Sequence, residues 1–237
     1  MSGYYIDTHV HTTEVSPCGK VPAQTMIQLY KAAGYAGVCV TDHYYKGFFE
    51  KMGDIPWKEK ALRYCRGYYA AKEMGDKLGI RVYFGQEMRF YDHPNDFLVY
   101  GISPQEIEDN PELYRMTLDT YRDFAHAHGA LIFQAHPFRT PPCAPANPAW
   151  LDGVEVYNGH PDHNSRNALA QQFAEMCDLP QISGTDFHRP HHLARGGVIA
   201  DHLPADEKEL ARMLATHEGI LSLIRSPGGM GNEYLEK

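Results

Sequence analysis

Short apolar runs alternate along the chain with longer segments in which apolar residues recur at helical spacing. Most of the short runs are apolar at every position, as in parallel strands that are buried on both faces. Strands connected by helices in this way are typical of an α/β protein built from β/α units. The pattern predicts strands at residues 4–6, 37–41, 81–85, 97–101, 130–134, 153–157, 181–184 and 219–224.

The longer segments carry the start signals of amphipathic helices. Pro22 stands where a proline is favoured in the first helical turn, and Asp206 with Glu209 has the spacing of a capping pair. These signals and the periodicity predict helices at residues 22–33, 61–78, 113–126, 166–177 and 206–214. The apolar faces expected in the second and fourth helices are Leu62, Cys65 and Tyr69, and Leu169, Phe173 and Met176.

Two long stretches, residues 44–60 and 140–150, show no period, and the second contains too much proline for a helix or a central strand. Each follows a predicted strand, so we expect loops that form walls over a site. The sequence shows no linker and no internal repeat. We therefore expect residues 1–237 to form a single domain.

The composition narrows the classes of function. Hydrophobic residues make up 43% of the chain, which is enough for a large core. The formal charge of −8, from 22 basic and 30 acidic residues, disfavours the binding of long nucleic acid. A small phosphorylated substrate is compatible with that charge, because bound metal cations can supply the positive charge that the side chains lack.

The sequence also indicates a cellular compartment. It has no secretory signal, no apolar run of about eighteen residues, and no CxxC pair among its five cysteines. These features favour a reducing cytoplasm and no membrane association. The oligomeric state is not indicated.

Histidine is frequent, with 14 in 237 residues, and its placement is informative. Five predicted strands end in His, Asp or Glu. Carboxyl ends of parallel strands meet at one rim of a β/α barrel, so we expect these side chains to converge. Imidazoles and carboxylates suit Zn, Mn or Fe, and burying them together without a cation would be costly. The predicted metal ligands are His9, His11, His43, Glu87, His136, Asp186 and His188.

These residues belong to an ordered series of motifs, which runs D-x-H-x-H, TDH, GxE, AHP and GTDxH from Asp7 to His188. The series resembles that of the PHP family, the polymerase and histidinol phosphatase superfamily, and the resemblance extends from Tyr5 to about Gly197. It implies a distorted seven-stranded (β/α) barrel that carries two or three divalent transition metal ions. It also implies that these ions serve phosphoester hydrolysis.

The resemblance further assigns ligands to the first two ions. One metal would lie among His9, His11, Glu87 and Asp186. Glu87 would bridge to a second metal that His136 also holds.

A third ion would be held by His43 and His188 together with a ligand from the loop after His11. Relatives often have His or Asp at that place, whereas this chain has Cys18. A thiolate binds zinc well, so Cys18 is one option and Glu14 is another. A purely structural role of the cysteine is a third option.

Many relatives carry another histidine near the predicted strand at 97–101. The matching residue here is Asp96, which could substitute as a ligand, or Ser103, which would be a poor one. By the same resemblance, Asp7 and Asp42 correspond to groups that orient the neighbouring imidazoles.

Clustered cations can hydrolyse a phosphoester through a metal-activated hydroxide, without a protein nucleophile. The chain has no Gly-x-Ser-x-Gly elbow and no glycine-rich P-loop. We therefore expect hydrolysis of a small phosphomonoester. The alternatives are a phosphodiesterase or exonuclease that acts on nucleotides or short oligonucleotides, and a non-catalytic metal-binding module.

Some residues have expected roles beyond metal binding. Asp186, His188 and Arg139 are the predicted catalytic residues. Arg139, Asn158 and His160 are the predicted substrate contacts, since all three follow strand ends on the rim that carries the metals. An arginine at position 139 could equally be an ordinary surface residue.

Overall fold

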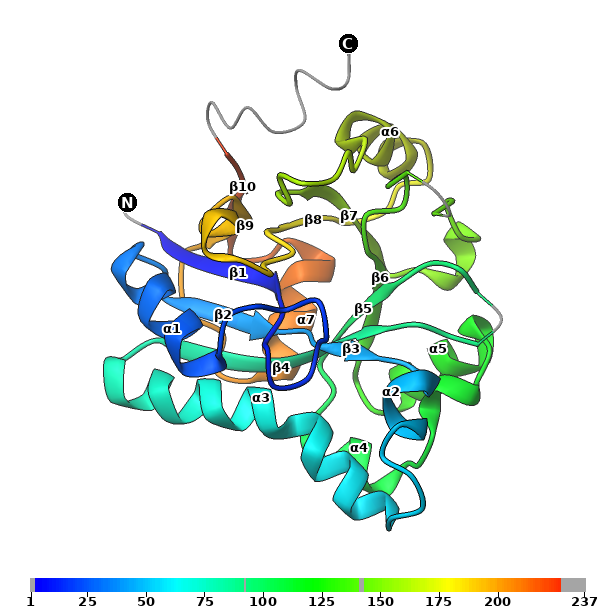
Figure 1. Ribbon diagram of the computed structural model, residues 1–237. Coiled ribbons are helices and arrows are strands. Elements are labelled where there is room, and N and C mark those ends of the chain that lie inside the picture. Colours follow the sequence, from blue (N-terminus) through cyan, green and yellow to red (C-terminus); the bar gives the residue numbers. More distant parts are fainter. Residues whose placement is uncertain (1–2, 92, 141–142, 227–237) are drawn as a thin grey trace.

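The computed structural model describes residues 3–91, 93–140 and 143–226, and within them ten strands form one curved sheet (Figure 1). The strands are β1 (Tyr4–Val10), β2 (Gly37–Val40), β3 (His43–Tyr44), β4 (Arg81–Met88), β5 (Phe97–Tyr100), β6 (Leu131–Gln134), β7 (Gly153–Asn158), β8 (Gln181–Gly184), β9 (Gly196–Ala200) and β10 (Ile220–Arg225). Their order is β10-β9-β1-β2-β4-β5-β6-β7-β8, and β3 pairs with the end of β4.

β1 and β8 come close enough to make the sheet a nearly closed barrel. Val10 at the end of β1 pairs in parallel with Phe187, which follows β8. The Thr8 hydroxyl donates to the Ser183 carbonyl over 2.7 Å, which adds a second link between β1 and β8. The predicted distorted barrel is thereby confirmed, although the sheet has more strands than the seven expected.

The strand directions are mixed. β1, β2 and β4 run parallel, as do β6, β7 and β8, whereas β5 lies antiparallel between β4 and β6. β9 pairs antiparallel with both β1 and β10. All eight predicted strands are present, but the expectation of a parallel sheet is wrong for β5 and β10. β3 and β9 were not predicted, because two residues or a glycine-led run carry too weak a pattern.

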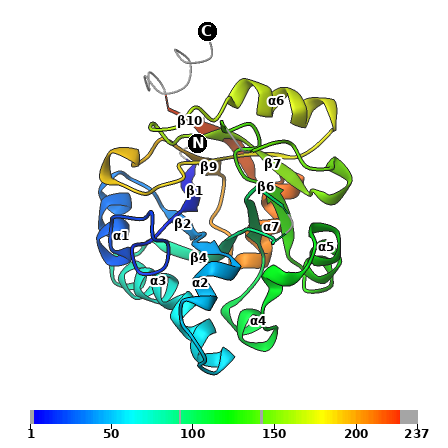
Figure 2. The same cartoon turned by 45° about the vertical axis from the view of Figure 1, so that its right-hand side comes forward.

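Seven α-helices accompany the sheet in the described part of the chain, and the last of them contacts β4, β5, β6 and β8 together (Figure 2). They are α1 (Ala23–Ala32), α2 (Lys46–Glu50), α3 (Trp57–Leu78), α4 (Pro104–Asp109), α5 (Leu118–Ala127), α6 (Asn167–Met176) and α7 (Glu207–Thr216). Three short 3₁₀ turns are η1 (Leu113–Arg115), η2 (Pro148–Trp150) and η3 (Pro190–His192). Each predicted helix has a counterpart, and the segment predicted at 113–126 divides into η1 and α5. The Asp206 carboxylate caps α7 by accepting from the Glu209 backbone N–H over 2.8 Å, as predicted.

The buried faces of α3 and α6 differ from those expected. Leu62 and Tyr69 of α3 are exposed, and Met176 of α6 keeps 86% of its surface in solvent. α6 instead packs on β7 through Ala170 and Ala174. Small residues allow a helix to approach a sheet closely, so residue size outweighs hydrophobicity in choosing this face.

The stretch 44–60, expected to be a loop, contains α2 and the start of α3. Tyr44 and Phe49 are almost fully buried and pack against each other with ring centroids 4.7 Å apart. Phe49 also stacks on Tyr114 at 5.5 Å. These aromatic residues therefore belong to the core.

The stretch 140–150 is largely irregular apart from η2, and Pro141 and Pro142 lie outside the described residues. Across the described chain, no helix is both long and apolar enough to span a membrane.

Candidate metal centre

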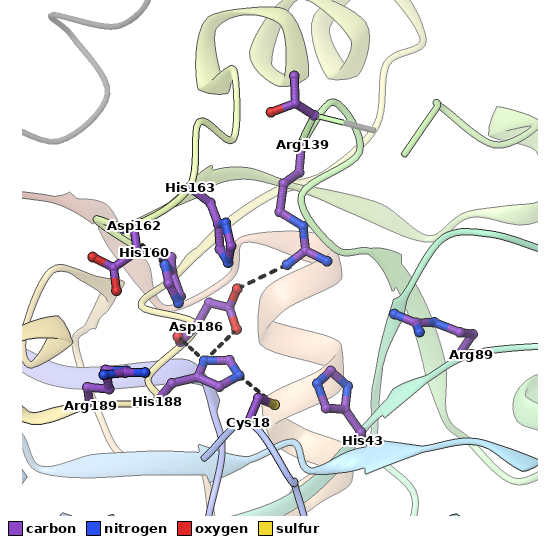
Figure 3. Close-up of a pocket in the computed structure, with 11 residues that line it drawn as sticks. Cys18, His43, Arg89, Arg139, His160, Asp162, His163, Asp186, His188 and Arg189 are labelled. Atoms are coloured by element: carbon purple, nitrogen blue, oxygen red, sulfur yellow. Dashed lines mark hydrogen bonds and ion pairs between the residues drawn. The ribbon is translucent and has the colours of Figure 1, made fainter. Parts of the chain in front are cut away.

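The seven predicted ligands converge at the carboxyl rim of the barrel. β1 supplies His9 and the residue after its end, His11, while β3 begins with His43 and β4 supplies Glu87. His136 follows β6, and Asp186 and His188 follow β8. All but His43 are buried, at 9% exposure or less. Figure 3 shows Asp186, His188 and His43 around one cavity.

Two of these residues have a backbone conformation that is rare for non-glycine residues. His136 has φ of 27° and Asp186 has φ of 52°. Such conformations cost energy and persist where the surroundings hold them, often at functional sites. The His136 backbone N–H donates to Glu155 Oε2 over 3.0 Å, which helps to hold this turn.

Glu87 lies at the middle of the cluster. Its Oε1 is 3.0 Å from His136 Nε2, and its Oε2 is 2.7 Å from His43 Nδ1 and 3.3 Å from His11 Nε2. Despite these short distances, Glu87 Oε2 is buried without a hydrogen bond in the described structure. A buried carboxylate oxygen that faces two imidazole nitrogens without hydrogen-bond geometry is suited to a cation between them.

The hydrogen bonds of His9 and His11 determine where their lone pairs point. His9 Nδ1 is 2.8 Å from Glu155 Oε1, and because a carboxylate only accepts, Nδ1 carries the proton. The Ser16 hydroxyl donates to Asp42 Oδ1 over 2.7 Å, so it accepts from His11 Nδ1 at 3.1 Å. The neutral form of each ring therefore has its lone pair on Nε2.

These two Nε2 atoms lie only 3.1 Å apart. Asp186 Oδ1 is 3.5 Å from the first and 3.2 Å from the second. Two lone pairs and a carboxylate that meet in a buried space repel each other unless a cation lies between them. The donor set of imidazole and carboxylate groups fits Zn, Mn or Fe, and it fits the first metal position that the sequence motifs indicate.

When no metal is present, protons on the imidazoles compensate the negative charge of the carboxylates. Burial lowers the pKa of His9, but the carboxylates of Glu155, Asp186 and Glu87 outweigh it and raise the pKa well above 6.5. Burial raises the pKa values of Glu87 and Asp186, but the surrounding imidazoles outweigh it and lower both. The metal-free cluster thus carries positive charge on its imidazoles beside ionised carboxylates.

Cys18 lies at the place where a third ion was expected. Its Sγ is 3.0 Å from His188 Nε2, and Figure 3 shows the sulfur between His188 and His43. Burial raises the pKa of this thiol, but hydrogen bonds with His188 and His43 outweigh it and lower the pKa to about 5. His188 Nδ1 donates to the Asp186 carbonyl over 2.7 Å, which leaves Nε2 for the cysteine side. A thiolate and two imidazoles form a donor set that suits zinc.

Glu14 and Ser103 have structural roles. Both Glu14 oxygens accept from the Ala23 backbone N–H at the start of α1, over 3.0 and 3.1 Å. Ser103 caps α4 by accepting from the Glu106 backbone N–H. Glu14 therefore caps a helix and is not the ligand offered as an alternative to Cys18, and Ser103, which was expected to be a poor ligand, also caps a helix.

Asp96 approaches His43 and Glu87, with ligand atoms within 4.8 Å of one another. Its two oxygens nevertheless accept from Arg89 Nε at 2.7 Å and Arg89 Nη2 at 2.8 Å. Arg139 Nη2 lies 3.5 Å from the same carboxylate. Because these arginines occupy the oxygens, we assign Asp96 to them and not to a metal.

The groups that orient the ligands are partly those expected. Asp42 acts on His11 through Ser16, as predicted. Asp7 does not contact an imidazole: it accepts from the Tyr30 hydroxyl at 2.5 Å and from the backbone N–H groups of Thr185 and His9. That prediction is therefore wrong for Asp7, because the carboxylate points toward the backbone between β1 and β8. The partner of the His9 imidazole is Glu155.

Asn158 lies beneath the cluster of predicted metal ligands. It is fully buried, and its amide donates to Glu155 Oε2 at 2.9 Å and to Asp186 Oδ2 at 3.3 Å. These bonds orient two carboxylates of the centre. We therefore assign Asn158 a positioning role, in place of the substrate contact expected from the sequence.

A second group of histidines lies beside the centre, and hydrogen bonds determine which ring nitrogen of His160 and of His192 carries the proton. His160 Nδ1 accepts from the Asp162 backbone N–H at 3.2 Å. His192 Nδ1 accepts from the His188 backbone N–H at 3.2 Å, and its Nε2 donates to Asp162 Oδ2 at 3.1 Å. Neutral His160 and His192 therefore carry their protons on Nε2 and have no free lone pair there. Although three of these atoms are close enough for a metal, the hydrogen bonds argue against one.

A cavity of about 540 Å³ opens over the cluster (Figure 3). Its walls include the predicted residues Arg139, His160, Asp186 and His188, together with Cys18. Arg139 Nη1 is 3.6 Å from Asp186 Oδ2, so its guanidinium adjoins a predicted ligand. Burial lowers the pKa of His160 to about 3, which keeps the ring neutral near pH 7.

The order of these ligands along the chain matches a known family. The model of the PHP domain matches residues 7–226, which includes every ligand described above. The chain belongs to the PHP domain family. Within this PHP domain, the metal-ligand assignments made from the motifs correspond to side chains that meet at one rim.

Solved structures share the fold of this PHP domain. A two-domain protein from Bacteroides vulgatus, named for a predicted PHP-like metal-dependent phosphoesterase, has 20% sequence identity and a TM-score of 0.64. The similarity covers 95% of this chain but 65% of that one, so the PHP domain spans less than two thirds of that neighbour. A candidate metal-dependent phosphoesterase from Bifidobacterium adolescentis has 14% identity and a TM-score of 0.55, over 90% of this chain and 96% of its own. A comparison with curated proteins finds no match.

Proposed function

We propose that this PHP domain is a metal-dependent phosphoesterase that hydrolyses a small phosphomonoester. The observation that carries the proposal is the convergence of His9 Nε2 and His11 Nε2, 3.1 Å apart, on the carboxylates of Asp186 and Glu87. Membership of the family and the names of the structural neighbours support the same class of activity.

The donor atoms suggest how the residues divide between ions. His9, His11 and Asp186 would hold one ion, and Glu87 would extend from it to a second ion beside His136. Divalent ions bound there would supply hydroxide near neutral pH and would polarise the phosphoryl oxygens. Catalysis would then rest on positioning and on charge stabilisation, without a protein nucleophile.

Two cavity residues are placed to act on the substrate. Arg139 adjoins Asp186, so its guanidinium can donate to a phosphoryl oxygen that reaches the metal centre. His160 is neutral and carries its proton on Nε2, so it can donate a hydrogen bond without adding charge. We assign both residues to the substrate and leave Asp186 and His188 with the metals.

The form of the site favours a monoester over a nucleic acid. The cavity of about 540 Å³ is in the range of small-molecule sites. The chain carries a formal charge of −8, which disfavours a long polyanion. A phosphodiesterase of short oligonucleotides is the second candidate, and a non-catalytic module the third. The complete set of seven converging ligands argues against the third.

The test is phosphate release by protein reconstituted with Zn, Mn or Fe, measured on a panel of phosphomonoesters and on bis-nitrophenyl phosphate. His9→Ala should lower turnover by at least about 100-fold, since loss of a supporting residue alone costs about 10–100-fold. His202→Asn is the control, because His202 is exposed and pairs with Asp201 away from the centre. Absence of phosphate release from every monoester, with His9→Ala equal to the wild type, would refute the proposal. Faster cleavage of the diester would favour the second candidate.

A further inference from the structure

One buried carboxylate holds two arginines at the wall of the cavity. Asp96 is 1% exposed and accepts from both Nε and Nη2 of Arg89, at 2.7 and 2.8 Å. Arg139 Nη2 lies 3.5 Å from the same carboxylate. Asp96 thus holds the Arg89 guanidinium by two hydrogen bonds and adjoins a second guanidinium, and both arginines line the cavity wall.

The two arginines face different parts of the site. Arg139 also lies 3.6 Å from Asp186, so it pairs with a predicted metal ligand. Arg89 follows β4 and reaches into the cavity from another side, as Figure 3 shows. Its side chain is 47% exposed, although the carboxylate that holds it is buried. Asp96 therefore holds one edge of the Arg89 guanidinium, and the other edge faces the cavity.

Arg89 stands where two cavities meet. It lines the cavity of about 540 Å³ over the metal centre and a second cavity of about 240 Å³. The two share Cys18 and His43, and the smaller one adds Pro17 and Tyr45. Since Asp96 takes Nε and Nη2, the Nη1 end of Arg89 remains for a ligand: in the described chain no protein partner occupies it. A rigid guanidinium with a free end recognises carboxylate or phosphate oxygens.

We propose that the substrate carries a second anionic group, a carboxylate or a second phosphate, and that Arg89 binds it while the reacting phosphate lies beside Arg139. This inference rests on the proposed phosphomonoesterase function. Asp96 acts as the positioning residue that orients both guanidinium groups. Arg89 is then the residue that determines specificity, because it contacts the part of the substrate that distinguishes one phosphomonoester from another.

The test uses ligands that cannot be hydrolysed as phosphoesters, so it does not depend on turnover. Propylphosphonate has one anionic group, 3-phosphonopropionate adds a carboxylate at similar size, and propylene-1,3-diphosphonate adds a second phosphonate. Calorimetry on metal-loaded protein should show at least one of the two dianionic ligands binding about tenfold or more tightly than propylphosphonate. The ligand with the larger gain identifies the second group as carboxylate or phosphate.

Arg89→Gln should remove this gain and leave the affinity for propylphosphonate unchanged. If that variant fails to fold because Asp96 becomes unpaired, Arg89→Lys keeps the charge but loses the fork, and it should reduce the gain. Arg63→Gln is the matched control, since Arg63 is also 47% exposed and pairs with a carboxylate, Glu59, on the outer helix α3.

The inference is overturned if all three ligands bind the wild type with equal affinity, or if none binds. It is also overturned if the Arg89 variants lose affinity equally for every ligand, which would mean a purely structural pair with Asp96. Failure of phosphate release with the gain intact would refute the proposed function alone.

Discussion

The Nδ1 atom of His9 on β1 lies 2.8 Å from the Oε1 atom of Glu155 on β7, across the interior of the barrel. Both groups are fully buried. The other oxygen of Glu155 accepts from the His136 backbone N–H and from the Asn158 amide. One carboxylate thus fixes the proton of one predicted ligand and the backbone of another.

We expect Glu155→Gln to weaken metal binding by about 10–100-fold, because a carboxylate that orients a ligand histidine also increases its basicity. Metal content after dialysis, measured by elemental analysis, and calorimetric affinity would report the change. Glu175→Gln on the exposed side of α6 is the control. Equal affinity of the wild type and Glu155→Gln would show that this bond does not support the centre.

Cys18 should react as a thiolate in the metal-free protein. With a pKa of about 5, about nine-tenths of it is ionised at pH 6, whereas an ordinary thiol is almost fully protonated there. The thiolate is present above the pKa and is lost below it, so the rate of alkylation should change little between pH 6 and 8. A model peptide should speed up about tenfold per unit of pH over that range.

Mass spectrometry after treatment with iodoacetamide would measure these rates, and Cys18→Ser would confirm the labelled site. Zinc should protect the thiol if Cys18 completes the third metal position with His43 and His188. A rate that rises with pH as steeply as in the peptide would contradict the lowered pKa. Unchanged labelling in zinc-saturated protein would exclude the cysteine as a ligand.

The converging ligands could be predicted from the sequence, because each lies at or just after the carboxyl end of a predicted strand, and those ends meet in a β/α fold. The hydrogen bond between His9 and Glu155 could not be predicted from the sequence. The two residues are 146 positions apart, and β5, β9 and β10 run antiparallel, so the neighbours across the barrel depend on the closure of the sheet. A glutamate within an otherwise apolar predicted strand is the one signal in the sequence that could have led to Glu155.

The roles of Asp96 and Asp7 were missed for a related reason. A carboxylate near a strand end has the same appearance in the sequence whether it binds a metal, an arginine or backbone amides. Asp96 lies beside Arg89 because the hairpin of β4 and β5 brings residues seven apart together. The faces of α3 and α6 were misjudged because Gly67, Ala170 and Ala174 make the close contacts that larger residues usually make.

Gly67 offers a test of that close packing. A Cβ added there would clash with Thr12 Oγ1 and lie 2.8 Å from Asp42 Oδ2, which accepts from that hydroxyl. The other oxygen of the same carboxylate, Oδ1, accepts from Ser16, which contacts His11. Gly67→Ala should therefore lower the free energy of unfolding by about 1–3 kcal/mol through overpacking, although alanine favours a helix by about 1 kcal/mol. Metal affinity should fall as well.

Urea denaturation and metal calorimetry would measure both effects. Ala70→Gly in the same helix is the control: it should cost about 1 kcal/mol of stability from helix propensity and leave metal binding unchanged. A Gly67→Ala variant that is more stable than the wild type would mean that the helix moves away without loss, and the contact with Asp42 would not matter.

Metal binding should release protons. In the metal-free protein, burial and Arg139 lower the pKa of His136, but the neighbouring Cys143 and Glu87 outweigh them and raise it to about 9. Burial lowers the pKa of His9 and of His43, yet nearby carboxylates, Glu155 for His9 and Glu87 for His43, outweigh it and raise both well above 6.5. These rings hold protons at pH 7 and must lose them to coordinate, so affinity should rise with pH up to about 9.

Calorimetry of zinc binding in buffers of different ionisation enthalpy counts the protons released. We expect at least about one proton per ion at pH 7, compared with about 0.2 for a free imidazole of pKa 6.5. His136→Asn should release fewer protons, whereas His202→Asn should match the wild type. Because a raised pKa means that protons and metal compete for the same nitrogens, a proton count near zero at pH 7, with affinity independent of pH, would contradict the positive charge assigned to the metal-free cluster.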